Sequence, residues 1–154
     1  MLNCLLTVGK AKEPFYQKAM EEYLKRLQRF GGSMHLSARP EKEGPSSRAE
    51  DLKNKEGLKL LKLIEPADTV WAMCVEGKPL SSEGWARELA KLSSRRLLLV
   101  IGGQLGLSRQ VSGRAQLQIS LGPITLPHEL AAVVALEQLY RAYTINAHMP
   151  YHRA

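Results

Sequence analysis

The sequence predicts an α/β fold in which helices cover both faces of a mostly parallel sheet. Short apolar runs alternate along the chain with longer segments of helical periodicity, the pattern of a parallel sheet with crossover helices. The length of 154 residues fits a single domain spanning residues 1–154. No apolar run approaches the roughly 20 residues of a membrane span, so we expect no membrane association.

The N-terminal half is predicted to contain two strands and two helices. Residues 1–8 form an apolar run without a preceding basic segment, which favours a buried strand over a signal peptide. Residues 34–38 form a short strand, and residues 39–46 form a charged loop. Ser47 and Glu50 have the spacing of a capping box for a helix that reaches about residue 64. The first helix is indicated by apolar side chains at helical spacing: Phe15, Ala19, Tyr23, Leu27 and Phe30.

The C-terminal half is predicted to contain three buried strands, at residues 69–75, 97–101 and 117–121. Helices are expected from residue 81 to about residue 92, around residues 108–115 and at residues 129–145. The last two strands each run into a glycine-bearing loop, residues 102–106 and residues 122–128. Loops at the carboxyl ends of parallel strands are where ligands bind, so these two loops predict one small-molecule pocket. The first loop matches neither G-x-G-x-x-G nor a Walker A motif, and an ordinary strand-to-helix turn is the alternative.

Charge and cysteine content limit the partners and the compartment. The net charge of +7 favours a polyanionic partner, with nucleic acid first, although a merely soluble basic protein would have the same charge. Cys4 and Cys74 lie in apolar runs and are expected to be reduced core residues of a cytoplasmic protein. Because the histidines and cysteines show no metal-ligand spacing, no metal is expected.

Polar residues near the C-terminus are candidates for chemistry. His128 follows a proline at the start of the last predicted helix and could act as a base, contact RNA or bond to nearby backbone. Glu137 and Arg141 are four residues apart and can pair, either as a structural clamp or within a site. The tail offers a stacking ring, an imidazole and a guanidinium in Tyr151-His152-Arg153, unless it is simply a frayed terminus.

Nine short segments form an ordered set along the chain. They are Val8-Gly9-Lys10, Glu22-Tyr23-Leu24-Lys25-Arg26, Lys55-Glu56-Gly57, Gly77-Lys78, Ser82-Glu83-Gly84, Ile101-Gly102-Gly103, Leu126-Pro127-His128, Glu137-Gln138-Leu139-Tyr140-Arg141-Ala142 and Tyr151-His152-Arg153. This set resembles the small single-domain SPOUT methyltransferases of large-subunit ribosomal RNA, over essentially the whole chain. The resemblance implies a C-terminal trefoil knot, a homodimer and S-adenosyl-L-methionine as methyl donor. It also implies methylation of N3 of a pseudouridine in 23S rRNA on the assembled ribosome. The apolar surface of residues 129–145 likewise favours a second subunit.

The same resemblance assigns roles to individual residues. Candidates for accepting the N3 proton are His128, Glu137 and His152. Arg141 and Arg153 are expected to contact phosphates, and Tyr151 is expected to stack on a base. The cofactor site is expected at Met73, Gly102, Leu121, Gly122, Pro123, Ile124, Thr125 and Leu126.

The sequence departs from the family pattern at Gln104, Leu105 and Ala132. Two alternatives to methylation of 23S rRNA stay open. The first alternative is a SPOUT methyltransferase that acts on another RNA. The second, which these departures keep open, is a ribosome-binding assembly factor that retains the fold without turnover.

Overall fold

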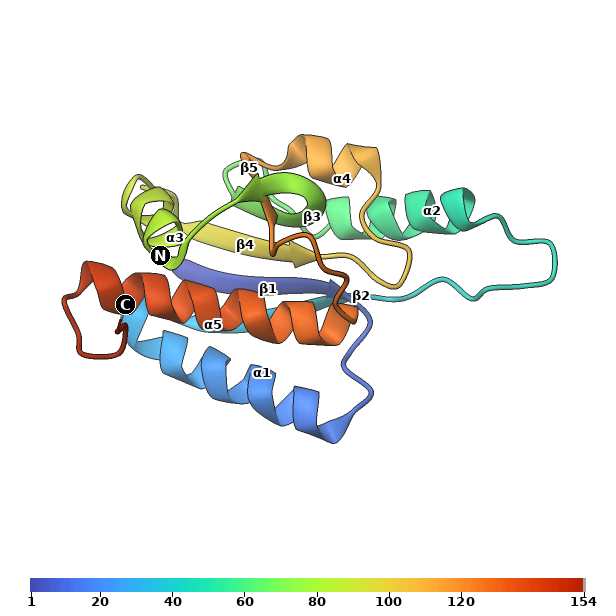
Figure 1. Ribbon diagram of the computed structural model, residues 1–154. Helices are drawn as coiled ribbons and strands as arrows, with labels where there is room; N and C mark the ends of the chain where they lie inside the picture. Colours follow the sequence, from blue (N-terminus) through green and yellow to red (C-terminus); the bar gives the residue numbers. More distant parts are fainter. Residues whose placement is uncertain (154) are drawn as a thin grey trace.

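Five parallel strands form the centre of the structure, a computed structural model that describes residues 1–153 (Figure 1). The strands are β1 (Leu2–Val8), β2 (Ser33–Ala38), β3 (Thr69–Pro79), β4 (Arg96–Ile101) and β5 (Leu117–Ser120). Their order across the sheet is β2-β1-β4-β3-β5, and every neighbouring pair is parallel. The predicted α/β fold with a parallel sheet is therefore confirmed.

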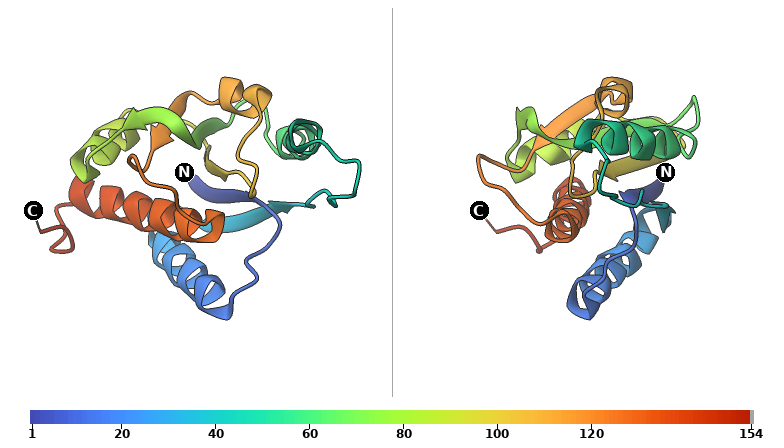
Figure 2. Two further views of the ribbon diagram at one scale, coloured as in Figure 1. Left: turned by 45° about the vertical axis from the view of Figure 1, so that its right-hand side comes forward. Right: turned by 90° about the vertical axis from the view of Figure 1, so that its right-hand side faces the viewer.

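Helices cover both faces of this sheet, as Figure 2 shows from two further directions. One face carries α1 (Pro14–Leu27), which continues as a 3-10 turn (Gln28–Phe30), together with α3 (Ser82–Ala90) and α5 (His128–Asn146). The other face carries α2 (Ala49–Leu61) and α4 (Arg109–Arg114). No helix within residues 1–153 is long and apolar enough to cross a membrane.

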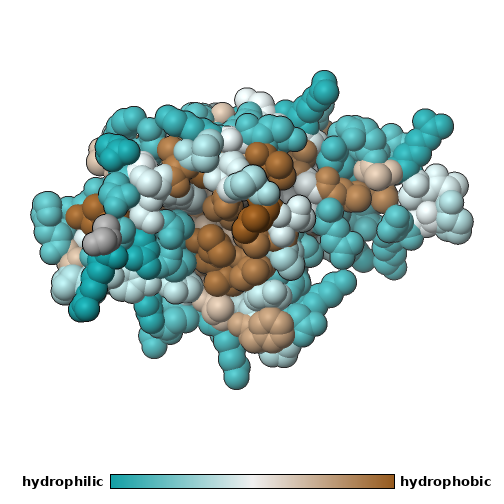
Figure 3. All heavy atoms as spheres, in the orientation of Figure 1, coloured by the Kyte–Doolittle hydropathy of each residue, from teal (hydrophilic) through white to brown (hydrophobic). Residues whose placement is uncertain are grey.

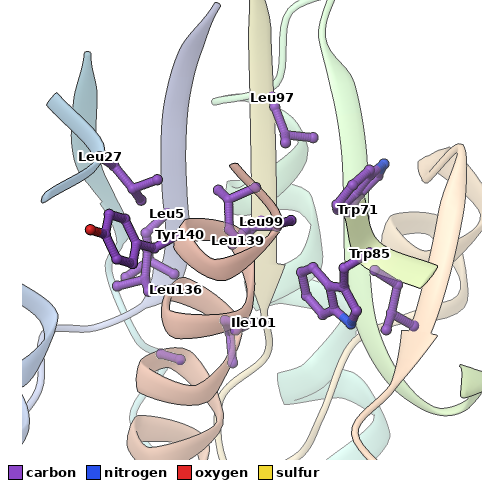
Figure 4. Packing of buried hydrophobic residues seen from close by; sticks show 14 of the residues in the cluster. Leu5, Leu27, Trp71, Trp85, Leu97, Leu99, Ile101, Leu136, Leu139 and Tyr140 are labelled. Carbon is purple, nitrogen blue, oxygen red and sulfur yellow. The ribbon is translucent and has the colours of Figure 1, made fainter. Parts of the chain in front are cut away.

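The apolar run in β4 explains why both faces must be covered. Side chains alternate along a strand, so Leu97, Leu99 and Ile101 pack into the core beneath α5 while Leu98 and Val100 pack beneath α2 and α4. Figure 4 shows the first of these cores, in which the rings of Trp71 and Trp85 meet edge to face at 5.6 Å. A strand that is apolar on both sides therefore lies in the middle of the sheet.

The strand order creates a crevice between β1 and β4. The chain leaves β1 for β2 on one side, and it leaves β4 for β5 on the other side. The two loops that follow β1 and β4 consequently diverge, and such a topological switch point is where open α/β sheets bind ligands.

Two local predictions are wrong. α2 begins at Ala49 without a side-chain cap, because the Ser47 hydroxyl instead accepts a hydrogen bond from the Gly44 N–H at 2.8 Å. Glu50 pairs with Lys53 at 3.0 Å, so the expected capping box does not form.

The strand expected to end at residue 75 is also longer than predicted. β3 continues to Pro79, and both Met73 and Lys78 are opposite Ile119 of β5. The residues between them bulge out at the carboxyl edge of the sheet, and Val75 is 78% exposed there. The bulge places the end of β3 beside the loops that follow β4 and β5. The trefoil knot implied by the family resemblance stays a prediction.

Candidate functional site: a cavity at the carboxyl edge of the sheet

A cavity opens where β3, β4 and β5 end. Its empty volume, including the open mouth, is about 620 Å³. Apolar side chains such as Ile101 and Ile119 form much of the wall, and the backbone of Gly102, Gly103 and Gly106 forms another part. Apolar walls with a few backbone polar groups suit a flat, partly polar ligand.

Most of the residues predicted to bind the cofactor line this cavity. Pro123 lies in the same loop, but it is exposed and does not line the cavity. The residues that do line it are Met73, Gly102, Leu121, Gly122, Ile124, Thr125 and Leu126.

The glycines after β4 are required by the loop itself. A Cβ on Gly102 would stand 2.5 Å from the carbonyl carbon of Gly106, which is too close for any side chain. The Gly106 N–H donates to the Gly103 carbonyl at 3.0 Å, and Gly106 has a φ of +79° that favours glycine. The tight turn therefore exposes backbone to the cavity, and a residue larger than glycine at position 102 would break it.

The bulge of β3 adds Cys74 and Val75 to the wall, which the sequence did not predict. Both cysteines are free; Cys4 is buried as predicted, whereas Cys74 is only half-buried. Burial, helped by the nearby charge of Glu76, raises the pKa of the Cys74 thiol to about 11. The thiol is therefore protonated at neutral pH and is a poor nucleophile. No sequence signal marked these positions, because the bulge depends on pairing with β5.

His128 lies at the first position of α5 and lines the same cavity. The helix therefore begins one residue earlier than the predicted start at residue 129, and Pro127 is its N-cap residue. The His128 imidazole is 4.0 Å from the carboxylate of Glu129, which accepts a hydrogen bond from the Lys12 N–H at 2.8 Å. Of the three candidate proton acceptors, His128 is thus the one placed at the cavity.

The other two candidates belong to a second group of residues, which we call the tail cluster: Glu83, Glu137, Arg141, Tyr151 and His152. Glu137 accepts hydrogen bonds from Arg141 Nε at 3.0 Å and from the Tyr151 hydroxyl at 3.1 Å. Arg141 lies over the Tyr151 ring, 4.7 Å from its centroid. The predicted pair of Glu137 and Arg141 therefore exists, and the tail is docked on α5.

His152 joins this cluster to α3. Its Nε2 is 2.9 Å from the Glu83 carboxylate, and its Nδ1 is 3.4 Å from Arg141 Nη1. Arginine only donates hydrogen bonds, so the neutral ring that satisfies both contacts carries its proton on Nε2. The backbone N–H of Glu83 and the His152 side chain both lower the pKa of the Glu83 carboxyl.

The cavity and the tail cluster are separate in the structure. Glu137 follows His128 by nine residues on α5, which corresponds to roughly 13 Å along the helix axis. Arg153 is exposed at the end of the tail. Within residues 1–153, no group of three or more histidine, cysteine or acidic side chains could hold a metal ion.

Comparison with known proteins connects this arrangement to a family. A family model described as "Predicted SPOUT methyltransferase" matches residues 1–152. The chain belongs to the SPOUT methyltransferase family. A protein named "Ribosomal RNA large subunit methyltransferase H" from Oenococcus oeni is 43% identical, with 99% of this chain and 100% of that protein covered. The protein of the same name from Lactiplantibacillus plantarum is 40% identical, with 97% and 98% covered.

A solved structure supports the fold of this SPOUT methyltransferase. "The structure of a probable methylase family protein from Haemophilus influenzae Rd KW20" superposes with a TM-score of 0.58. The match covers 99% of this chain and 70% of that one at 10% identity, so it shows a shared fold alone.

The three positions at which this SPOUT methyltransferase is expected to depart from the family pattern do not line the cavity. Gln104 and Leu105 lie beside it, on the wall of a neighbouring cleft. Ala132 belongs to α5, and its side chain is buried in the core between this helix and the sheet.

Proposed function

We propose that this protein transfers a methyl group from S-adenosyl-L-methionine to N3 of a pseudouridine in large-subunit ribosomal RNA. The proposed substrate is the assembled ribosome in the cytoplasm, and the proposed active form is a knotted homodimer. The observation that carries the proposal is the cavity at the ends of β3, β4 and β5, in a chain whose relatives are named as methyltransferases of large-subunit ribosomal RNA. The net charge of +7 suits a ribonucleoprotein substrate.

The residues of the cavity fit the proposed cofactor. Ile101, Ile119 and Leu126 offer an apolar slot for the adenine ring, and the glycine turn after β4 offers backbone groups at close range. Met73 and the loop from Leu121 to Leu126 would enclose the remainder. When bound, the cofactor supplies a methyl group whose carbon is a strong electrophile, because it is attached to a positively charged sulfur.

The chain's own task is to position the acceptor nitrogen and to receive its proton. As the bond from N3 to the methyl carbon forms and the sulfur–carbon bond breaks, the N3 proton must leave. His128 borders the cavity and is the candidate acceptor within the same subunit. Glu137 is less suited, because its oxygens already accept hydrogen bonds from Arg141, Tyr151 and Gln138. Positioning can supply much of the rate enhancement in such a transfer.

An apolar surface supports the proposed dimer. Figure 3 shows hydrophobic side chains gathered in the middle of the face that carries α5 and the loop before it. Ile124 in that loop and Phe15 at the start of α1 are each 62% exposed, and Leu130 and Val134 of α5 are only half-buried. Because the tail cluster and the cavity are separate in one subunit, we infer that the tail of one subunit completes the cavity of the other.

The deciding experiment is mass mapping of ribosomal RNA from cells that lack the protein. Loss of one methylated pseudouridine, restored by purified protein and labelled S-adenosyl-L-methionine acting on those ribosomes, is the expected result. A change in another RNA would instead support a SPOUT methyltransferase of different specificity. Unchanged RNA modification, together with impaired ribosome assembly, would support the non-catalytic assembly factor and overturn the proposal.

A further inference from the structure

A second cleft lies beside the cofactor cavity, at the switch point between β1 and β4. The loops after β1, β2 and β4 converge there near the beginning of α5 (Figure 1). Its empty volume, including the open mouth, is about 1,080 Å³, larger than that of the cofactor cavity. Gly103 and His128 line both cavities, so the two are adjacent. A ligand in this cleft would therefore lie next to a ligand in the cofactor cavity.

Glu56 of α2 is the buried charged residue of this cleft. It is 8% exposed, and its Oε2 accepts a hydrogen bond from the Glu41 N–H at 3.1 Å. Its Oε1 lies at the wall shared with the cofactor cavity, 3.4 Å from where a Cβ on Gly103 would stand. Within residues 1–153, no donor reaches this oxygen. Among residues 1–153, the fully buried polar side-chain atom without a partner is Arg96 Nε, so Glu56 Oε1 keeps access to the open cleft and can accept a hydrogen bond from a ligand that brings an N–H group.

The remaining walls match other parts of a nucleotide. Lys10 and Lys12 follow β1 on one side of the cleft and can contact a phosphate. Glu41, a second acidic residue in the wall, is already paired with Lys59 at 2.6 Å. Glu43, the third acidic residue of the wall, is exposed to solvent, so Glu56 is the buried carboxylate that can accept a hydrogen bond from a base edge.

On the basis of the proposed function, we propose that this cleft holds the acceptor base and that Glu56 selects pseudouridine over uridine. Pseudouridine is attached to its ribose through carbon and keeps an N–H at ring position N1, whereas the N1 of uridine is bonded to the ribose. Ring atoms N1 and N3 are separated by one carbon, so a base with N3 toward the cofactor cavity can turn N1 toward the adjoining wall. Glu56 Oε1 accepts the N1–H there and gives no comparable hydrogen bond to uridine.

The substitution Glu56→Gln tests this assignment with little change in shape. The amide oxygen must keep accepting from the Glu41 N–H, so the amide NH₂ group faces the cleft and replaces an acceptor with a donor. We expect kcat/KM on pseudouridine-containing ribosomes to fall roughly 10-fold or more. We also expect the preference over ribosomes that carry uridine at the same position to disappear. Affinity for S-adenosyl-L-methionine, measured by calorimetry, should stay within a few fold.

Two further variants make the result decisive. Glu50→Gln changes an exposed carboxylate on the same helix, paired with Lys53, and should behave as the wild type. Glu56→Asp keeps the charge but retracts the carboxylate by one methylene group, and should weaken the preference partly; it serves as the test if Glu56→Gln does not fold. A wild-type preference in the folded Glu56 variant would overturn the assignment. If the wild-type protein methylates neither kind of ribosome, the proposed function itself fails.

Discussion

The hydroxyl of Tyr151 donates a hydrogen bond to Glu137 across 3.1 Å and so ties the C-terminal tail to the middle of α5. The Tyr151 ring also meets the Tyr140 ring edge to face, with centroids 4.9 Å apart. Burial, with a smaller contribution from a hydrogen bond to Tyr23, raises the pKa of the Tyr151 hydroxyl. The tail is therefore part of the folded structure, although its polar sequence is typical of a frayed terminus.

Deletion of residues 150–154 should lower stability and abolish methylation. Loss of the hydrogen bond and of the ring packing should reduce the free energy of unfolding by about 1–3 kcal/mol, measured by urea denaturation. Cofactor affinity should remain within a few fold, because the residues that line the cavity all lie between Met73 and Ala131, outside the deleted segment. As a control, Tyr151→Phe keeps the ring for stacking and should reduce stability by about 1 kcal/mol. A truncated protein that methylates ribosomes at the normal rate would refute the role of the tail.

The sequence predicted the sheet well because its signal is local. The apolar run from Leu97 to Ile101 indicates a strand buried on both sides, and the loops after β4 and β5 follow from where such strands end. Tyr151 and Glu56 could not be placed in this way, because their surroundings are built by α5 and by the loop after β2. Ser47 shows the same limit: its hydroxyl had two possible backbone partners, and the loop geometry selected Gly44.

Blocking the cofactor cavity should abolish cofactor binding without unfolding the protein. Ala131 lines the cavity from α5, so Ala131→Phe should fill it and reduce S-adenosyl-L-methionine binding below detection by calorimetry. Gly102→Val is a poorer test, because its Cβ would collide with the backbone of Gly106. Ala90→Phe, at the exposed end of α3, is the matched control and should bind normally. Normal affinity in Ala131→Phe would remove this cavity from the cofactor site.

Mixing two inactive variants should restore activity if the site is shared between subunits. The tail-deleted protein keeps an intact cavity, and Ala131→Phe keeps an intact tail. Hybrid dimers formed by mixing and exchange would contain one site with both parts, so methylation of ribosomes should return partly. Each variant alone provides the baseline. The absence of any recovery, with subunit exchange verified by mass spectrometry, would place the tail and the cavity of one site in the same subunit.

Light scattering should give a mass near twice 17.2 kDa for the wild-type protein. Val134 is half-buried on α5 and lies outside the packed core, so Val134→Glu should place a charge in the proposed interface and yield a monomer. Leu58→Glu, at a 53% exposed position on the opposite face of the sheet, should remain dimeric. A wild-type protein that is monomeric at micromolar concentration would contradict the proposed interface.

Stability should also depend on pH through His35. The Thr7 hydroxyl donates to the Gly9 carbonyl at 2.7 Å, so it accepts from His35 Nε2, also at 2.7 Å. Burial, and secondarily the charge of Lys10, lowers the pKa of His35 in the folded protein. The unfolded chain takes up this proton near its ordinary pKa of about 6.5. The contribution of His35 to the free energy of unfolding is therefore fully present above about pH 6.5, and it is lost as the pH falls from there through the lowered pKa.

The substitution His35→Gln removes this titration while retaining a side chain that can donate to Thr7. Urea denaturation between pH 8 and pH 5 should show the wild-type free energy of unfolding decreasing below about pH 6.5, and a flatter profile for the variant. Carboxyl groups with lowered pKa values, such as Glu83, act near and below pH 4.5 and affect both proteins alike. His148→Asn, at an exposed histidine, should keep the wild-type profile. Parallel profiles for the wild type and His35→Gln would show that His35 does not control stability in this range.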